Sequence, residues 1–91
     1  FNAPVCFEAY CEFAPHAFPE LQGLEGVRGA ERFIDALAAL AVDIGLQPRL
    51  RDVGIPRDAL PTLASDAMKQ TRLLVNNPRE VTEADARAIY E

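Results

Sequence analysis

Apolar side chains recur at helical spacing along much of the chain, most clearly in residues 30–44. There the segment AERFIDALAALAVDI places its large apolar residues on one broad face of a helix with a period of about 3.6 residues. The members of this face are Phe33, Ile34, Leu37, Leu40, Ala41 and Ile44. The many alanines also favour helix formation. The pattern predicts a helix over 30–44 that Gly45 caps at its C-terminus and that Pro48 prevents from resuming.

The opening residues predict a second helix, from Pro4 to about Ala14. Pro4 suits the first turn of a helix, where the missing amide hydrogen breaks no hydrogen bond. The apolar positions near the helical period are Val5, Phe7, Tyr10, Cys11 and Ala14. We expect Pro15 and Pro19 to end this helix, and the link from there to Gly29 to be irregular.

After Pro48 the chain alternates apolar and polar residues over a short extended or turn segment, which Gly54 and Pro56 close. The apolar residues expected to fill the core here are Leu46, Leu50, Val53 and Ile55. A further helix is predicted over about 60–69, because Pro61 would fall in its first turn. Its expected buried side consists of Leu63, Ala64, Ala67 and Met68.

The segment LLVNNPRE predicts a loop, because Pro78 disfavours helical backbone angles at Asn77. A strand of three residues at 73–75 is an alternative within it. Thr82 and Asp85 have the spacing of a capping box, so the last helix is expected to start there. Its expected buried face consists of Ala86, Ile89 and Tyr90. Together these patterns predict an all-α fold, a small helical bundle of about four helices forming a single domain over 1–91.

Composition and charge limit the binding partners and the cellular compartment that we expect for this chain. The chain of 91 residues is too short for more than one domain, and its net charge of −5 with scattered basic residues argues against nucleic acid as a partner. No apolar run is long enough to span a membrane, and no signal peptide is recognisable. Cys6 and Cys11 do not form a Cys-x-x-Cys motif, which predicts reduced, buried or half-buried thiols. A cytoplasmic protein is therefore expected.

The chain carries few residues for catalysis. A metal site needs three or four donors, yet His16 is the single histidine and is expected at the surface. It has no sequence signature linking it to a nucleophile, and Glu8 and Glu12 read as a solvated helical surface. The glycines of LQGLEGVRG follow no strand, so they do not form a dinucleotide motif. We therefore predict no catalytic, cofactor-binding or metal-binding residue in this chain.

The ends of the chain and the wording of its second half point to a larger parent. The sequence starts at Phe1 without Met and stops inside a predicted helix, so we expect it to be a segment of a longer protein. The stretches IGLQPRLRDVGIPRDALPTLASDAMK and RLLVNNPREVTEADARAIYE resemble the closing portion of iron-containing alcohol dehydrogenases. The resemblance spans about 33–91, and Phe1-Asn2 with Tyr10 adds to it, whereas HAFPELQGLEG carries none.

This resemblance implies a two-domain parent enzyme. An N-terminal α/β domain would bind NAD or NADP, and a helical C-terminal domain would supply histidines to iron or zinc. Hydride would pass from an alcohol to the nicotinamide while the metal polarises the oxygen. The family's metal ligands lie upstream of Phe1, so none corresponds to a residue here.

The family also suggests one place near the substrate. The loop before its Asn-Pro pair passes the substrate pocket, which implies pocket-lining roles for Leu73, Leu74 and Val75. The alternative is that these three fill the core. Some members have a cysteine where Leu73 stands, so leucine would make the wall more apolar.

Three hypotheses for the role of the chain remain. The first is a C-terminal fragment of such a dehydrogenase, inactive alone, that packs against a missing nucleotide-binding domain and self-associates without it. The second is a free-standing helical interaction module that binds a partner helix through the apolar face of 30–44. The third is a small structural or regulatory oligomer.

Overall fold

A computed structural model describes all residues, 1–91, and shows a chain built from helices alone. The five α-helices are α1 (Ala3–Ala17), α2 (Gly26–Asp43), α3 (Leu60–Ala67), α4 (Thr71–Leu74) and α5 (Glu83–Tyr90). Two short 3-10 helices, η1 (Leu50–Val53) and η2 (Arg57–Ala59), precede α3. The predicted all-α class is confirmed. The chain divides into two compact units, 1–48 and 49–91, and the single domain expected over 1–91 stays a prediction.

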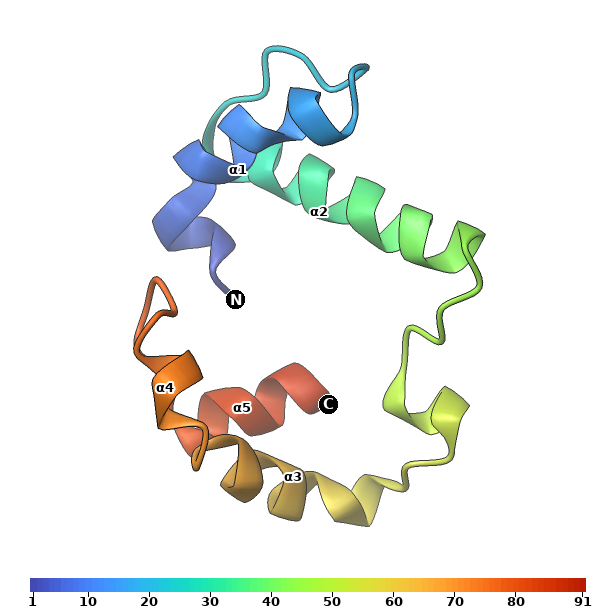
Figure 1. Ribbon diagram of the computed structural model, residues 1–91, viewed down its shortest axis with the longest axis vertical. Helices are drawn as coiled ribbons and strands as arrows, with labels where there is room; N and C mark the ends of the chain where they lie inside the picture. The colour runs from blue at the N-terminus through green and yellow to red at the C-terminus, as the bar shows by residue number, and fades with distance from the viewer. The chain divides into compact units, whose positions relative to one another are not determined.

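In the first unit α1 and α2 lie side by side (Figure 1). Small residues allow this contact, since Ala14, Gly29 and Ala30 are all buried. The ring of Phe33 on α2 meets two other rings edge to face, with centroids 6.2 Å from Tyr10 and 6.0 Å from Phe18. Such edge-to-face pairs add stability beyond the area they bury, so this aromatic group helps to hold α1 on α2.

Helix α1 is longer than the sequence pattern predicts, because Pro15 lies inside it. Pro15 has no amide hydrogen to donate, but the next turn is still closed by the Phe18 N–H, which donates to the Ala14 carbonyl at 2.8 Å. The helix has non-helical backbone angles at Cys6, where φ is −138° and ψ is 27°. The predicted break at Pro15 is therefore wrong, and the helix ends at Ala17.

Helix α2 is confirmed as the main helix, although it starts before residue 30. Its first turn is closed by the Gly29 N–H, which donates to the Glu25 carbonyl at 3.0 Å. At the other end the Gly45 N–H donates to Val42 and the Leu46 N–H to Ala41, at 3.0 and 2.9 Å. These two bonds, with Gly45 at a φ of +80°, form a Schellman cap, so the predicted role of Gly45 is confirmed.

The predicted apolar face of α2 is only partly covered. Phe33 and Ala41 are half-buried. Four other members of the face keep much of their surface accessible, namely Ile34 (39%), Leu37 (43%), Leu40 (43%) and Ile44 (64%). The contacts with α1 therefore cover the beginning of this face better than its end.

Of the two alternatives predicted for the segment after Pro48, an extended run or a turn, the extended run is wrong. Residues 50–53 form η1 rather than an extended run, and the Ile55 N–H returns to the Leu50 carbonyl at 3.1 Å. Gly54, at a φ of +79°, permits this tight reversal. Leu50 and Ile55 are half-buried, but Leu46 and Val53 are 58% and 57% exposed, so the prediction that these two fill the core is wrong.

In the second unit α3 packs against α5 (Figure 1). Leu60, Ala64 and Ala86 are buried in this unit, and Pro61 occupies the first turn of α3 as predicted. The remaining predicted members of the α3 face are half-buried, namely Leu63, Ala67 and Met68. On α5 Tyr90 is half-buried, whereas Ile89 is 57% exposed. The predicted burial of Ile89 is therefore wrong.

The start of α5 confirms the predicted capping box. The Asp85 N–H donates to Thr82 Oγ1 at 3.2 Å, and the Thr82 N–H donates to Asp85 Oδ2 at 2.9 Å. Each residue thus satisfies a backbone amide of the other at the helix start.

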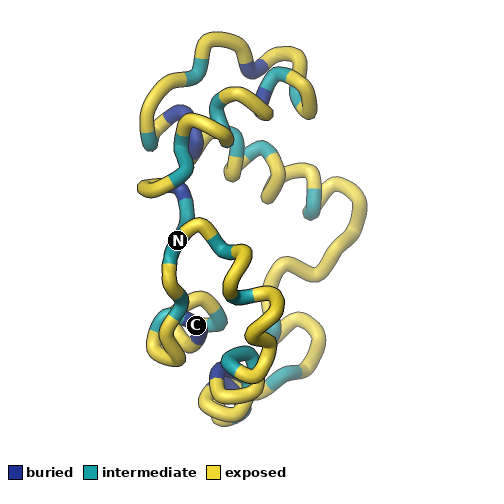
Figure 2. The backbone as a smooth tube through the Cα atoms, turned by 60° about the vertical axis from the view of Figure 1, so that its left-hand side comes forward, coloured by how far each residue is buried: buried dark blue, intermediate teal, exposed yellow.

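The core of each unit is small, as Figure 2 shows by its short buried stretches among long exposed ones. The buried apolar residues are Ala3, Ala14, Leu21, Ala30, Leu60, Ala64 and Ala86. Most of them are alanines, so little apolar area is removed from water per residue. None of the helices has the length and apolar character needed to cross a membrane.

Candidate functional site

The segment implied to line a substrate pocket begins in α4, a single helical turn. The Leu74 N–H donates to the Gln70 carbonyl and the Val75 N–H to the Thr71 carbonyl, each at 3.1 Å. The Asn76 side-chain amide donates to the Arg72 carbonyl at 2.9 Å and closes the end of this turn. The alternative of a strand at 73–75 is therefore wrong. The loop predicted for LLVNNPRE is wrong at Leu73 and Leu74, which are helical, and is confirmed from Val75 onward, where the chain forms turns and bends.

The three candidate residues do not share one environment. Leu73 and Val75 are 59% and 79% exposed, whereas Leu74 is half-buried. The alternative that all three fill the core is wrong for Leu73 and Val75.

Leu74 and Val75 border an open depression of about 320 Å³ in the second unit. Its lining residues are Leu74, Val75, Asn77, Arg79, Glu80 and Val81. The Asn77 side-chain amide donates to the Arg79 carbonyl at 2.6 Å, which bridges the two sides of Pro78 and shapes this loop. The depression therefore joins apolar side chains of the α4 turn to polar ones of the Asn-Pro-Arg segment.

Leu73 does not line this depression, and four of its lining residues were not predicted. These are Asn77, Arg79, Glu80 and Val81. The sequence feature that could have indicated these four lining residues is the Asn-Pro-Arg motif. A proline between two polar residues constrains the loop that follows the apolar turn.

The possible metal donors in this chain do not form a site. No group of three or more His, Cys, Asp or Glu side chains is placed to hold a metal ion. His16 is exposed in the last turn of α1, rather than in a break between helices. Cys6 and Cys11 are free and half-buried thiols, and they donate to the carbonyls of Asn2 at 3.2 Å and Gly26 at 3.5 Å. These residues do not fit a resident metal centre.

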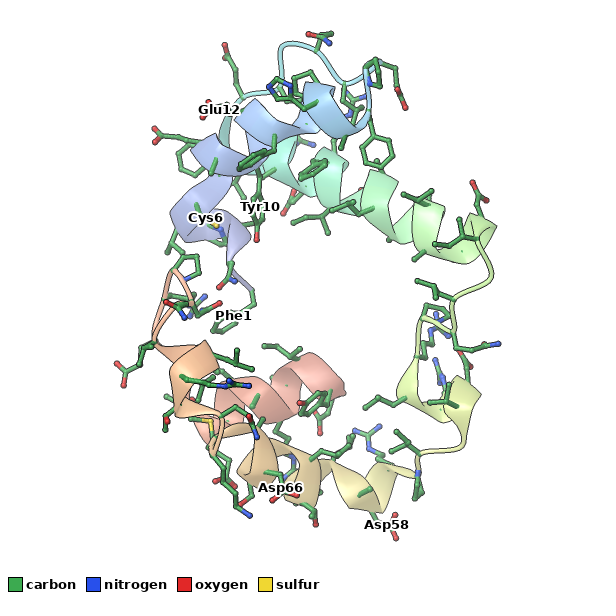
Figure 3. All side chains as sticks on the ribbon, in the orientation of Figure 1. Phe1, Cys6, Tyr10, Glu12, Asp58 and Asp66 are labelled. Atoms are coloured by element: carbon green, nitrogen blue, oxygen red, sulfur yellow. The ribbon has the colours of Figure 1, made fainter.

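Tyr10 and Asp85 are among the side chains whose pKa values are moved by their surroundings. Burial raises the pKa of the Tyr10 phenol, and a hydrogen bond with the Cys6 side chain raises it further; Figure 3 shows both side chains on α1. The hydrogen bonds of Thr82, first from its side chain and then from its backbone, lower the pKa of Asp85. Both shifts belong to structural contacts, and Glu8 and Glu12 are exposed on α1, so none of these groups suggests an acid-base centre.

Comparison with known proteins places the whole chain in one family. Residues 1–91 match the Fe-containing alcohol dehydrogenase family, C-terminal. The match includes residues 16–26, where the sequence pattern alone carried no resemblance. The chain therefore belongs to the iron-containing alcohol dehydrogenase family and represents its C-terminal region.

Curated relatives agree with this assignment. A long-chain-alcohol dehydrogenase 1 of Geobacillus thermodenitrificans is 41% identical over 68 residues, covering 75% of this chain and 17% of that protein. Lactaldehyde reductase of Escherichia coli is 31% identical over 90 residues, covering 99% of this chain and 23% of that protein.

A third relative, 1,3-propanediol dehydrogenase of Klebsiella pneumoniae, is 31% identical over 83 residues, with 91% of this chain and 21% of that protein covered. The chain thus spans between 17% and 23% of the length of these relatives. No solved structure matches the chain.

Proposed function

We propose that the chain is the C-terminal helical part of a metal-dependent, NAD(P)-linked enzyme that interconverts alcohols and aldehydes by hydride transfer. The observation that carries this proposal is the family match over the entire chain. The relatives named above act on alcohols or aldehydes by their names, which supports the reaction class. In this proposal the metal and the nicotinamide are held by residues outside 1–91.

The role of the chain in such an enzyme would be to wall the substrate cleft rather than to perform the chemistry. Leu73, Leu74 and Val75 are the residues proposed for this wall. The exposure of Leu73 and Val75 and the position of Leu74 and Val75 beside the depression support this role. Their aliphatic side chains would contact the part of the alcohol that does not react.

Such a wall favours alcohols with an apolar chain over small polar ones. Removing an apolar chain from water is worth about 0.8 kcal/mol for each buried methylene, so preference should rise with chain length. A relative that is 41% identical to this chain over 68 residues is named for long-chain alcohols, which supports the same direction.

The isolated chain is proposed to be inactive and to need the preceding nucleotide-binding part of the parent as its partner. The test compares a polypeptide of residues 1–91 with the complete protein encoded by the same gene. We expect about 300 further residues upstream in that protein, which is the length of two more domain-sized units. Each is assayed for oxidation of 1-alkanols of increasing length with NAD or NADP and added iron or zinc.

Activity in the complete protein alone would support the proposal. Activity in neither, across all alcohols, cofactors and metals, would overturn the reaction class, and activity of residues 1–91 alone would overturn the division of roles. As a binding control, nicotinamide cofactor and divalent iron or zinc should leave the melting temperature of the isolated chain unchanged. A saturable rise would reveal a site within these residues.

The second candidate is a free-standing helical interaction module that uses the apolar face of α2. The exposure of Leu37, Leu40 and Ile44 is the observation in its favour. The two candidates differ in the gene: a reading frame that begins with its own Met next to Phe1 would favour the module. An upstream strand-helix repeat with a glycine-rich phosphate turn would favour the dehydrogenase.

A further inference from the structure

We draw no further inference here: the strongest candidate, the exposed apolar face along the second half of α2, carries none because nothing in the structure shows what covers it.

Discussion

Gly29 of α2 lies so close to Cys11 of α1 that a Cβ atom on Gly29 would come within 2.9 Å of the Cys11 sulfur. The same Cβ would lie 3.1 Å from two atoms of Leu24, one of them in the backbone. The backbone angles of Gly29 are helical, so its conformation does not require glycine. Glycine is needed at this position because the neighbouring atoms leave too little room for a Cβ atom.

Replacing Gly29 with alanine should destabilise the chain although alanine is the better helix former. Alanine gains about 1 kcal/mol of helix propensity, but overpacking a tight contact costs about 1–3 kcal/mol, and the Leu24 backbone cannot move aside as a flexible side chain could. Urea unfolding followed by circular dichroism measures the difference. The double variant Gly29→Ala with Cys11→Ala should recover part of the loss, since it removes the sulfur but not Leu24. A Gly29→Ala variant as stable as the parent sequence would contradict the proposed contact.

Replacing Gly45 with alanine should also destabilise the chain, for a different reason. No atom lies within 4 Å of the position a Cβ would take, but the φ of +80° is unfavourable for a side chain. The left-handed conformation costs an ordinary residue about 1–2 kcal/mol, and asparagine tolerates it better. Gly45→Asn is therefore the matched control and should lose less stability than Gly45→Ala in the same unfolding experiment. Equal losses would argue against the Schellman cap.

Replacing Thr82 with alanine should remove the cap of α5 and lower stability by about 1 kcal/mol. Thr82→Ser keeps the hydroxyl and should retain most of the stability. Thr82→Ala should also raise the pKa of Asp85, because the Thr82 hydroxyl donates to the Asp85 carboxylate at 2.6 Å in the intact protein. Titration of the Asp85 carboxyl by NMR in both variants checks this. A pKa of Asp85 that is the same in Thr82→Ala would contradict the hydrogen bonds of the capping box.

The same shift predicts how stability depends on acidity. The pKa of Asp85 is lower in the folded protein than its ordinary value of 3.8, so its contribution is fully present above that value. The contribution is lost as the pH falls through the lowered pKa. Asp85→Asn should therefore be less stable than the parent sequence at neutral pH. The difference in stability between the two should become smaller as the pH is lowered towards 2. A constant difference across that range would show that the charge of Asp85 plays no part.

The apolar wall proposed at Val75 can be tested in the complete enzyme. Val75→Thr keeps the shape of the side chain and adds a hydroxyl, so kcat/KM for long-chain alcohols should fall about tenfold, with a smaller change for ethanol. Val53→Thr is the control, because Val53 is also an exposed valine, at 57%, and does not line the depression. A wild-type profile without preference for longer chains, or an equal effect of both variants, would remove Val75 from the substrate wall while leaving the reaction class intact.

The isolated chain should self-associate in water. Its exposed large apolar residues include Phe13 at 62% and Val75 at 79%, and such surfaces are rarely left open in a monomer. Sedimentation at increasing concentration should show dimers or larger species. The double variant Phe13→Glu with Val75→Glu should shift them towards monomer, while Ala38→Glu, at an exposed alanine, should not. A compact monomer of the unchanged sequence at high concentration would contradict this prediction.

The resemblance to the family, rather than any residue spacing, implies pocket-lining roles for Leu74 and Val75. Both border the depression, and their contact with a substrate stays a prediction. The helical conformation of Leu74 was not predicted, because the side-chain bond from Asn76 to the Arg72 carbonyl that closes the turn competes with the loop signals around Pro78. The polar half of the lining, including Asn77 and Arg79, depends on how the loop folds back, which no residue spacing reveals.

The sequence by itself determined the features that rest on neighbouring residues. The α2 period, the cap at Gly45 and the box of Thr82 with Asp85 are set by hydrogen bonds within a few positions, so residue type and spacing were enough to predict them. Tertiary structure decided whether α1 would continue through Pro15 and which apolar side chains would be covered. The partial burial of Phe33 and the exposure of Ile44 on the same face depend on where a second helix lies, and that contact joins residues far apart in the chain.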